Sequence, residues 1–490
     1  MTLPHSGADV ARVRAGSGPG AMDAVVVGAG PNGLAAAIEL ARAGRSVRVF
    51  EAAATPGGGT RSAELTLPGF VHDVCSAAHP LAIASPFFRS LDLARHGLEW
   101  IQPDAPVAHA LAPGRSVVLE RDVNAMRESL GRDGPAWVRL FGPLVGEADR
   151  LMPMLLRPVI RPPRHPVLMA RFGLPALLPA SALARLAFRD TEARALFAGM
   201  AAHSMLGLNQ PISSSFALVL GLLGHAVGWP LVRGGSGRIA DALTTEARSL
   251  GVEIVAGREV RSLAELPPAR AILLDLTPRQ VVAIAGDVLP AGYRRSLERY
   301  RYGPGVFKVD WALSGPIPWR DPALGRAGTV HLGGTLRDVA ASEATVAAGK
   351  HAERPFLLLV QPTLFDPSRA PAGRHVAWAY CHVPAGSEVD MTAAIEAQLE
   401  RFAPGFRDLV LARATRDTPA MEAYDANYVG GDINGGIQDL RQALFRPVVR
   451  WNPYTTPVPK LYLCSSSTPP GGGVHGMSGF LAARAALGRL

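Results

Sequence analysis

Short apolar runs and longer helical stretches alternate along this 490-residue chain. Near the start, four apolar residues at 24–27 predict a buried strand, which a glycine turn and an alanine-rich helix ending near Gly44 follow. A second strand is predicted at 46–50. A strand, a helix and a second strand in this order predict a β-α-β unit within a parallel sheet.

The same alternation returns far along the chain. The pattern predicts a helix over 238–250, strands at 252–256, 259–263 and 271–274, and a last strand at 460–464 ahead of a helix that runs through 487. We interpret these segments as further parts of the same α/β layer.

Two long stretches of different character separate these pieces. Residues from about 106 to 225 are predicted to be mostly helical, whereas residues from about 291 to 439 mix strands at 306–311, 356–361 and 375–380 with a helix over 392–402. A chain of this length is expected to form two domains. A second domain inserted twice into the first explains the alternation most simply.

Composition narrows the class of protein. Apolar residues make up 48% and charged residues 19% of the chain, which indicates a folded protein and excludes a disordered one. The net charge of +9 would by itself suggest nucleic acid or an anionic membrane as partner. Only Lys308, Lys350 and Lys460 are lysines, however, and the many arginines are scattered among acidic residues. Nucleic-acid binding is therefore disfavoured.

The three cysteines, Cys75, Cys381 and Cys464, form no closely spaced pair. This argues against a disulfide framework, a metal site and a redox-active disulfide, and it favours a reducing, cytoplasmic compartment. Residues 1–21 lack the apolar core of a secretory signal and are predicted to be a flexible tail. No segment has the long uncharged apolar run of a spanning helix.

The turn after the first strand carries three spaced glycines. Gly28 permits the sharp turn, Gly30 lets the backbone approach phosphate oxygens, and Gly33 lets helix and strand pack closely. Glu51 ends the second strand at the spacing of an acid that binds a ribose hydroxyl. The pattern predicts a dinucleotide site, to which the intervening residues Ala29, Pro31 and Asn32 also belong.

Two further glycine runs favour a flavin over a nicotinamide. One, at 57–61, directly follows Glu51, and the other, at 471–476, lies between the last strand and the last helix. Each run alone could be an ordinary loop. Together with the first motif they fit FAD, since a helix N-terminus at 476 could meet the flavin edge where negative charge develops on reduction. A nicotinamide cofactor is disfavoured because no second G-x-G-x-x-G is present.

The chain resembles the phytoene-desaturase-like branch of the FAD-dependent amine oxidase and desaturase superfamily. The motifs that carry this resemblance are VVVGAGPNGLAAA, the glycines after Glu51, PGFVHD, WPLVRGGSGR, NYVGGDINGG and LYLCSSSTPPGGGVHGM. Within that branch it is most similar to the group named for a pyridine nucleotide-disulfide oxidoreductase domain. The resemblance spans nearly the whole chain from Ala21 onward.

The resemblance implies an α/β fold with a discontinuous, glutathione-reductase-like Rossmann domain that binds FAD and an inserted α+β domain. We assign 22–105, 226–290 and 440–490 to the FAD-binding domain, and 106–225 and 291–439 to the substrate or lid domain. Relatives carry a β-hairpin between the strand at Val260 and the next strand. In this chain only residues 263–270 connect the two strands. We therefore expect this hairpin to be pruned and the edge of the sheet to be shorter.

The resemblance also assigns cofactor contacts. Glycines 28, 30 and 33 hold the pyrophosphate, Glu51 the adenosine ribose, and the Val260 backbone the adenine. Gly58 and its neighbours would border the phosphates or the ribityl chain, and the flavin would meet Gly472, Gly473 and Val474. Relatives place arginine directly after the double glycine, where this chain has Gly59 and Thr60. This departure puts Arg61 in doubt as a phosphate ligand.

Flavin chemistry requires few catalytic groups from the protein. The candidates for proton transfer are His475, in the last glycine run, and then His79, His382 and His203, although each could be a structural histidine. Asp432 and Asn434 lie in a glycine-rich turn and are expected to be turn formers.

Residues 151–171 combine apolar bulk with arginines. They could lie on an anionic bilayer and admit an apolar substrate, or they could form a helical lid with solvated arginines. The prolines in this stretch favour the lid.

We expect an FAD-dependent dehydrogenase or desaturase that takes hydride from an apolar or conjugated, lipid-like substrate, with oxygen or a quinone as electron acceptor. The alternatives are redox-neutral isomerisation or saturation with reduced flavin, and a flavin-binding regulatory protein with little turnover. These hypotheses imply three kinds of partner. They are a small apolar substrate, a membrane that the protein contacts peripherally, and a second copy of the chain in a homodimer.

Overall fold

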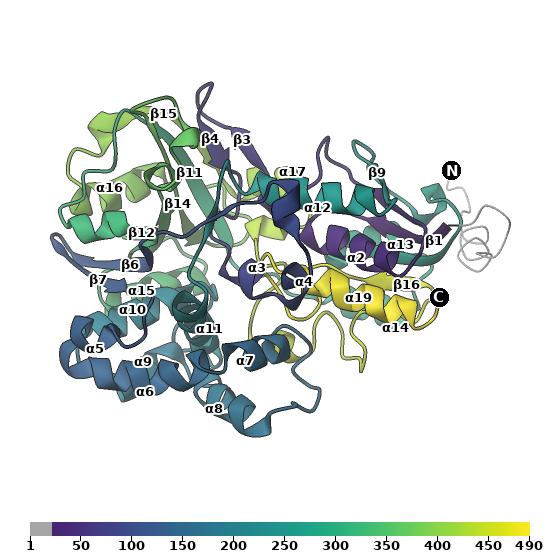
Figure 1. Ribbon diagram of the computed structural model, residues 1–490, viewed down its shortest axis with the longest axis horizontal. Coiled ribbons are helices and arrows are strands. Elements are labelled where there is room, and N and C mark those ends of the chain that lie inside the picture. The colour runs from purple at the N-terminus through teal and green to yellow at the C-terminus, as the bar shows by residue number, and fades with distance from the viewer. Residues whose placement is uncertain (1–21) are drawn as a thin grey trace.

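The computed structural model describes residues 22–490, so the predicted tail at 1–21 lies outside the described residues. A five-stranded sheet lies at the right of Figure 1, near the C-terminus. All of its pairings are parallel. Its order is β16 (Leu461–Leu463), β10 (Ala269–Leu274), β1 (Met22–Val27), β2 (Val47–Phe50) and β9 (Glu253–Val255).

The apolar run of β1 is buried because helices cover both faces of this sheet. Ala24 and Val26 pack into the core shared with α2 (Pro31–Arg42), α12 (Gly237–Ser249) and α19 (Met477–Leu487). Val25 and Val27 pack into the opposite core, which includes residues of α13 (Pro278–Ala285) and α14 (Ala291–Glu298). The predicted β-α-β unit and Rossmann-type fold are confirmed.

A seven-stranded mixed sheet forms the second layer, at the upper left of Figure 1. Its pairings are antiparallel except between β12 and β6. The order is β15 (Val410–Arg416), β11 (Gly305–Leu313), β14 (His375–Val383), β13 (Leu357–Val360), β12 (Ala327–Leu332), β6 (Ala105–Ala112) and β7 (Arg115–Leu119).

The two faces of this sheet differ in chemistry because side chains alternate along each strand. One face is apolar and packs, through residues such as Trp311, against α16 (Thr392–Phe402). The other face carries polar residues of β11, β12 and β14. It packs against α10 (Thr191–Ala202) and α15 (Leu336–Ala347).

The helices at the lower left of Figure 1 come from one continuous stretch. They are α5 (Met126–Ser129), α6 (Gly134–Val145), α7 (Ala148–Leu155), α8 (Pro166–Ala176), α9 (Ala180–Ala187), α10 and α11 (Ser213–Ala226). Among the described residues, no single helix is both long and apolar enough to cross a membrane. Only α8 and α9 together reach that length, and they meet at a bend of 103°.

Short elements complete the chain. They are α3 (Pro80–Ala84), α4 (Pro86–Arg89), α17 (Thr418–Tyr424), α18 (Leu440–Leu444), and the paired strands β3 (Ser62–Glu64) with β4 (Val71–Asp73) and β5 (Trp100–Ile101) with β8 (Leu231–Val232).

One prediction of secondary structure is incomplete and one is wrong. The stretch from about 106 to 225 is mostly helical, as predicted, but it begins with the β6–β7 hairpin, whose apolar residues are as compatible with a buried helix as with a strand. Val260 lies in a loop and not in a strand, because β9 is the edge of its sheet and no strand lies beyond it. The pruned edge is confirmed, since only a short 3₁₀ turn at Leu263–Glu265 separates Val260 from β10.

Candidate functional site

The first and last glycine signatures meet in space. Helix α19, yellow in Figure 1, lies along helix α2, purple. A Cβ atom on Gly479 would lie 1.7 Å from the backbone oxygen of Asn32, so only glycine permits this approach. The N-terminal ends of the two helices that follow the glycine turns therefore lie side by side, as one cofactor contacting both would require.

The first glycine turn has the geometry of a phosphate cradle. Gly28 has a φ of +98°, and a Cβ on Gly33 would lie 2.0 Å from the Gly28 carbonyl oxygen. The amides of Gly30 and Asn32, at the start of α2, donate to no group of the described residues, and the buried Asn32 side-chain oxygen has no partner. Unpaired amides at a helix N-terminus favour an anion.

Glu51 lies beside this turn at the end of β2. Its carboxylate accepts hydrogen bonds from the amides of Ala29 (2.7 Å) and Ala53 (2.9 Å) and pairs with Arg61 (3.1 Å). The loop with Val260 runs alongside, since the Arg258 amide donates to the Glu51 carbonyl. The residues predicted for the adenosine end are thus close together, whereas Arg61 is engaged by Glu51.

The second glycine run lies directly on the first. The Gly57 amide donates to the Ala29 carbonyl, and a Cβ on Gly58 would lie 3.3 Å from the Gly30 Cα. The Thr60 hydroxyl donates to the Gly57 carbonyl and so serves the turn. A Cβ on Gly59 would lie 2.1 Å from the Tyr428 hydroxyl, so a side chain at this position would clash with Tyr428.

Two carboxyls face these turns, of which Asp275 is buried and Asp425 is half-buried. Asp275, after β10, accepts the Gly33 amide at 2.8 Å, and burial raises its pKa to about 8. Asp425 lies near Gly58, and burial raises its pKa to about 6. At a pH below its pKa, a carboxyl carries a proton and no charge. Asp275 in this protonated form does not repel a nearby phosphate.

The last glycine run follows β16. Gly471 and Gly473 have φ values of +117° and +116°. A Cβ on Gly472 would lie 2.9 Å from the Asn434 carbonyl oxygen, and one on Gly473 would lie 2.5 Å from a methyl group of Leu81. Val474 packs against the core that contains α2 and α19. The loop is thus closely enclosed by the rest of the chain.

Arg446 is a buried cation beside Gly471 that the sequence analysis did not single out. Its guanidinium donates to Gln438 and Tyr300, both at 2.8 Å. Its Nε atom has no partner, and no carboxylate lies within ion-pair distance of it among residues 22–490, although its charge acts on the nearby Asp432 carboxylate. A buried, unpaired guanidinium is costly unless an anion compensates it. With the three glycine turns, this site fits an extended dinucleotide such as FAD.

The histidine candidates each bond a different partner, although His203 lies close enough to His382 for the two charges to interact. Both ring nitrogens of His475 bond within its own loop, to the Gly471 carbonyl and the Met477 amide, and burial lowers its pKa to about 4. His79 bonds the Ser236 hydroxyl, and burial lowers its pKa to about 4. His203 bonds His331 at 2.9 Å, and His382 pairs with Glu343 at 2.8 Å. The catalytic assignments of these histidines stay predictions.

Asp432 is the turn former that we predicted. Its carboxylate accepts the amides of Gly303, Asn434 and Gly436.

A row of side chains on the polar face of the mixed sheet was missed by the sequence analysis. The residues of this row lie in register on neighbouring strands, and they are His109, His331, Leu358, Tyr380, Lys308 and Arg416. Lys308 is buried, pairs with Asp310 and lies 5.1 Å from the centre of the Trp378 ring. Burial lowers the pKa of Lys308 and raises that of Asp310. The available signal was the rarity of lysine in this arginine-rich chain.

Cofactor loops and sheet meet at one apolar group, which we name the junction cluster. It consists of Met205, Val306, Met421 and Tyr428 with the partly buried Cys75, Tyr380, Tyr424 and Ile433. Tyr428 reaches the second glycine run at Gly59, and Met205 accepts the Asn434 side-chain amide next to Gly472. Met205 has a φ of +56°, a strained value typical of functional sites.

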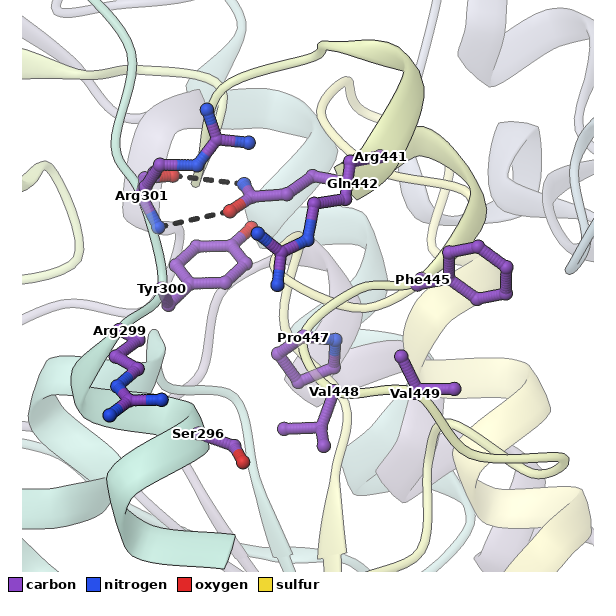
Figure 2. A pocket seen from close by; sticks show the side chains of 10 residues that line it. All are labelled: Ser296, Arg299, Tyr300, Arg301, Arg441, Gln442, Phe445, Pro447, Val448 and Val449. Carbon is purple, nitrogen blue, oxygen red and sulfur yellow. Dashed lines mark hydrogen bonds between the residues drawn. The ribbon is translucent and has the colours of Figure 1, made fainter.

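A surface pocket lies on the outer side of Tyr300 and holds about 350 Å³ (Figure 2). It is lined by Ser296, Arg299, Tyr300, Arg301, Arg441, Gln442, Phe445, Pro447, Val448 and Val449. None of these residues belongs to the glycine turns or to the row on the mixed sheet. We therefore place the cofactor at the three glycine turns and not in this pocket.

Within residues 22–490, all three cysteines are free, and no group of three or more metal-ligating side chains could hold a metal ion.

Comparisons with known proteins agree with this geometry. The family model of the NAD(P)-binding Rossmann-like domain matches residues 26–91. Pyridine nucleotide-disulfide oxidoreductase domain-containing protein 2 of Rattus norvegicus is 28% identical, over 93% of this chain and 92% of its own length. Hydroxyneurosporene desaturase of Cereibacter sphaeroides is 33% identical, over 48% of this chain and 49% of its own length.

A solved structure shows the same fold over the whole described chain. A triple mutant of putrescine oxidase matches with a TM-score of 0.62 at 20% identity and covers 96% of this chain and 99% of its own. At this identity the likeness concerns the fold alone. Together with the relatives and the glycine turns, it makes the chain similar in sequence and fold to the FAD-dependent amine oxidases and desaturases.

Proposed function

We propose that this protein is an FAD-dependent dehydrogenase or desaturase that removes two hydrogens from an apolar or conjugated substrate at the junction cluster. One observation carries the proposal. Two of the cofactor loops and the polar face of the mixed sheet, which carries Lys308, meet at the apolar junction cluster. Oxidation of an apolar molecule needs a site of this kind, where water is excluded and a cofactor is within reach.

The cofactor would be held by residues of all three turns. The free amides of Gly30 and Asn32 suit the pyrophosphate, Glu51 suits the ribose, and Arg446 suits the negative charge beside Gly471. When bound, FAD supplies the hydride acceptor.

The remaining proton of the substrate needs a base. When a C–H bond gives up hydride and the neighbouring carbon gives up a proton, a double bond forms between the two carbons. Lys308 is our candidate for the base, because burial lowers its pKa and Asp310 holds its amine in place. Oxygen or a quinone serves as the final electron acceptor in this proposal.

Tyr380 adds a polar group next to that base. Burial raises the pKa of its phenol, so the Tyr380 hydroxyl stays protonated and can donate a hydrogen bond. Its ring stacks on Trp378 with an interplanar angle of 8° and a separation of 5.8 Å between ring centres. Such a flat aromatic surface suits a conjugated substrate.

Anaerobic reduction of the bound flavin tests the proposal. The purified protein is mixed with three classes of compound, namely a polyene, an acyl lipid and a primary amine, and the visible flavin absorbance is followed. We expect bleaching with the polyene or the lipid. Bleaching with the amine alone would replace desaturation by amine oxidation.

Two further outcomes are informative. A protein that stays colourless when FAD is supplied would overturn the cofactor assignment. A protein that binds FAD but is never reduced by any class of compound would favour the regulatory reading.

A further inference from the structure

Helix α8 exposes apolar side chains on its solvent face. Val167, Ala170, Arg171 and Leu174 follow helical spacing along that face, and the side chains of Val167 and Leu174 are 76% and 70% exposed. The opposite face, with residues such as Leu168 and Phe172, is buried in the core. A helix that is apolar on both faces needs a second apolar environment.

The exposed apolar surface continues beyond α8. Leu177 follows the helix, and Leu186 on α9 is 78% exposed. A second segment, the loop after α18, presents Val449 and Trp451, with Trp451 at 72% exposure. We name the exposed residues of α8, α9 and this loop, together with the arginines at 157, 161 and 164 before α8, the apolar-arginine surface.

The two segments adjoin. Arg161, in the loop before α8, is close enough to the phenol of Tyr454 to act on it electrostatically. Helices α7 and α8 and the yellow loop lie along the lower edge of the molecule in Figure 1.

The charge of this surface is of one sign. No acidic residue occurs between Arg150 and Asp190 or anywhere after Asp439, although arginines occur throughout both segments. Arg157, Arg161 and Arg164 cluster, because burial and the charges of Arg164 and Arg161 together lower the pKa of Arg157. Among the described residues, none of these three arginines forms an ion pair. An anionic partner would compensate them.

We propose that the apolar-arginine surface binds an anionic lipid bilayer. Exposed leucine, valine and tryptophan side chains beside unpaired arginines are the combination that enters the headgroup region of such a membrane. Nucleic acid would pair with the arginines but would not cover Val167, Leu174 and Trp451.

The surface pocket adjoins the same loop. Phe445 and Val449 line it, and Figure 2 shows Arg299, Arg301 and Arg441 around it. Arg301 is paired with Asp439, whereas Arg299 and Arg441 form no ion pair among the described residues. The pocket thus adds cations to the edge of the proposed membrane surface.

Vesicle flotation tests the proposal with the full-length, FAD-loaded protein. We expect the protein to float with vesicles of phosphatidylcholine and phosphatidylglycerol, and to stay behind with phosphatidylcholine alone or at high salt. Substitution of Arg161 and Arg164 by glutamine should weaken binding by about fivefold for each arginine. The double variant Leu174→Ser, Trp451→Ser should lose flotation.

Matched controls distinguish binding by this surface from nonspecific adsorption of the protein to vesicles. Val389 and Leu411 are also exposed, at 47% and 46%, but belong to the substrate domain near α16 and β15. The double variant Val389→Ser, Leu411→Ser should float like the wild type. Brominated lipid should quench the tryptophan fluorescence of the wild type, and the variant Trp451→Phe should lose most of that quenching.

Other outcomes would overturn the proposal. These are a wild type that does not float with anionic vesicles, and patch variants that float as well as the controls. Patch variants that keep their flotation but slow flavin reduction by a soluble substrate would assign the segment to a helical lid instead. Flavin content and melting temperature, measured for every variant, show that it is folded.

Discussion

Lys308 on β11 lies directly opposite Tyr380 on β14, and both side chains face the junction cluster. Neither residue was predicted as part of the site, because the strands at 306–311 and 375–380 were predicted from their apolar positions. Their register on neighbouring strands puts an amine and a phenol at cross-strand distance. This pair gives the first test of the proposed chemistry.

Replacement of Lys308 by methionine should slow flavin reduction by about 100-fold or more, because the proton acceptor is lost. Lys308→Arg should slow it as well, since arginine cannot give up its proton at neutral pH. Stopped-flow measurement of flavin reduction under anaerobic conditions gives the rate. Lys350→Met, on an exposed lysine, is the control and should leave the rate unchanged. An unchanged rate in Lys308→Met would remove this residue from the mechanism.

Replacement of Gly33 by alanine should destabilise the protein by more than about 3 kcal/mol, because the new methyl group would meet the Gly28 carbonyl oxygen. Flavin content should fall with it. Gly292→Ala is the matched control, since nothing lies within 4 Å of a Cβ at that position. Thermal unfolding measures both variants. Equal melting temperatures for the two would contradict the close packing of helix and strand.

Replacement of Arg446 by methionine should release FAD, because the buried guanidinium beside Gly471 would no longer compensate its negative charge. We expect the dissociation constant for FAD to rise by about tenfold or more. Ultrafiltration followed by absorbance of the retained flavin measures it. The exposed arginine variant Arg441→Met is the control. If Arg446→Met instead bound FAD as tightly as the wild type, Arg446 would only stabilise the loop in which it lies and would not bind the cofactor.

The apoprotein should become less stable as the pH rises from about 4 to about 8. Burial raises the pKa of Asp275 to about 8, so the folded state keeps a proton that the unfolded chain loses near pH 4. The stabilisation from that proton is complete below pH 4 and is lost as the pH passes 8. Asp425, with a pKa raised to about 6, acts in the same direction.

The variant Asp275→Asn checks this dependence. Its amide oxygen can still accept the Gly33 amide, but it does not titrate. The slope of melting temperature against pH should therefore be smaller in Asp275→Asn than in the wild-type apoprotein. Parallel curves for the two proteins would show that Asp275 is ionised in the folded state.

The parallel sheet and its glycine turn were predictable because local chemistry determines them. The apolar run at 24–27, the three spaced glycines and Glu51 each have one strong structural interpretation, and the structure places them as expected. The β6–β7 hairpin was not predictable, since an apolar stretch buried on one side is compatible with strand or helix.

The missed residues of the site depend on long-range pairing. Lys308 reaches Tyr380 only through the register of two strands about 70 residues apart, and His331 reaches His203 only when α10 packs on the mixed sheet. Arg446 lies in a loop without regular structure, so no pattern marked it as buried. These relationships arise from tertiary packing, which a single sequence does not encode in local patterns.

The meeting of α2 with α19 also constrains how the protein matures in the cell. Because the last glycine run, β16 and α19 lie far after α2 in the chain, the parallel sheet and the cofactor cradle stay incomplete until these residues have been synthesised. At typical rates, translation of 490 residues takes on the order of a minute. A nascent chain therefore holds an incomplete cradle for most of that time, and tight cofactor binding has to wait until α19 has packed against α2.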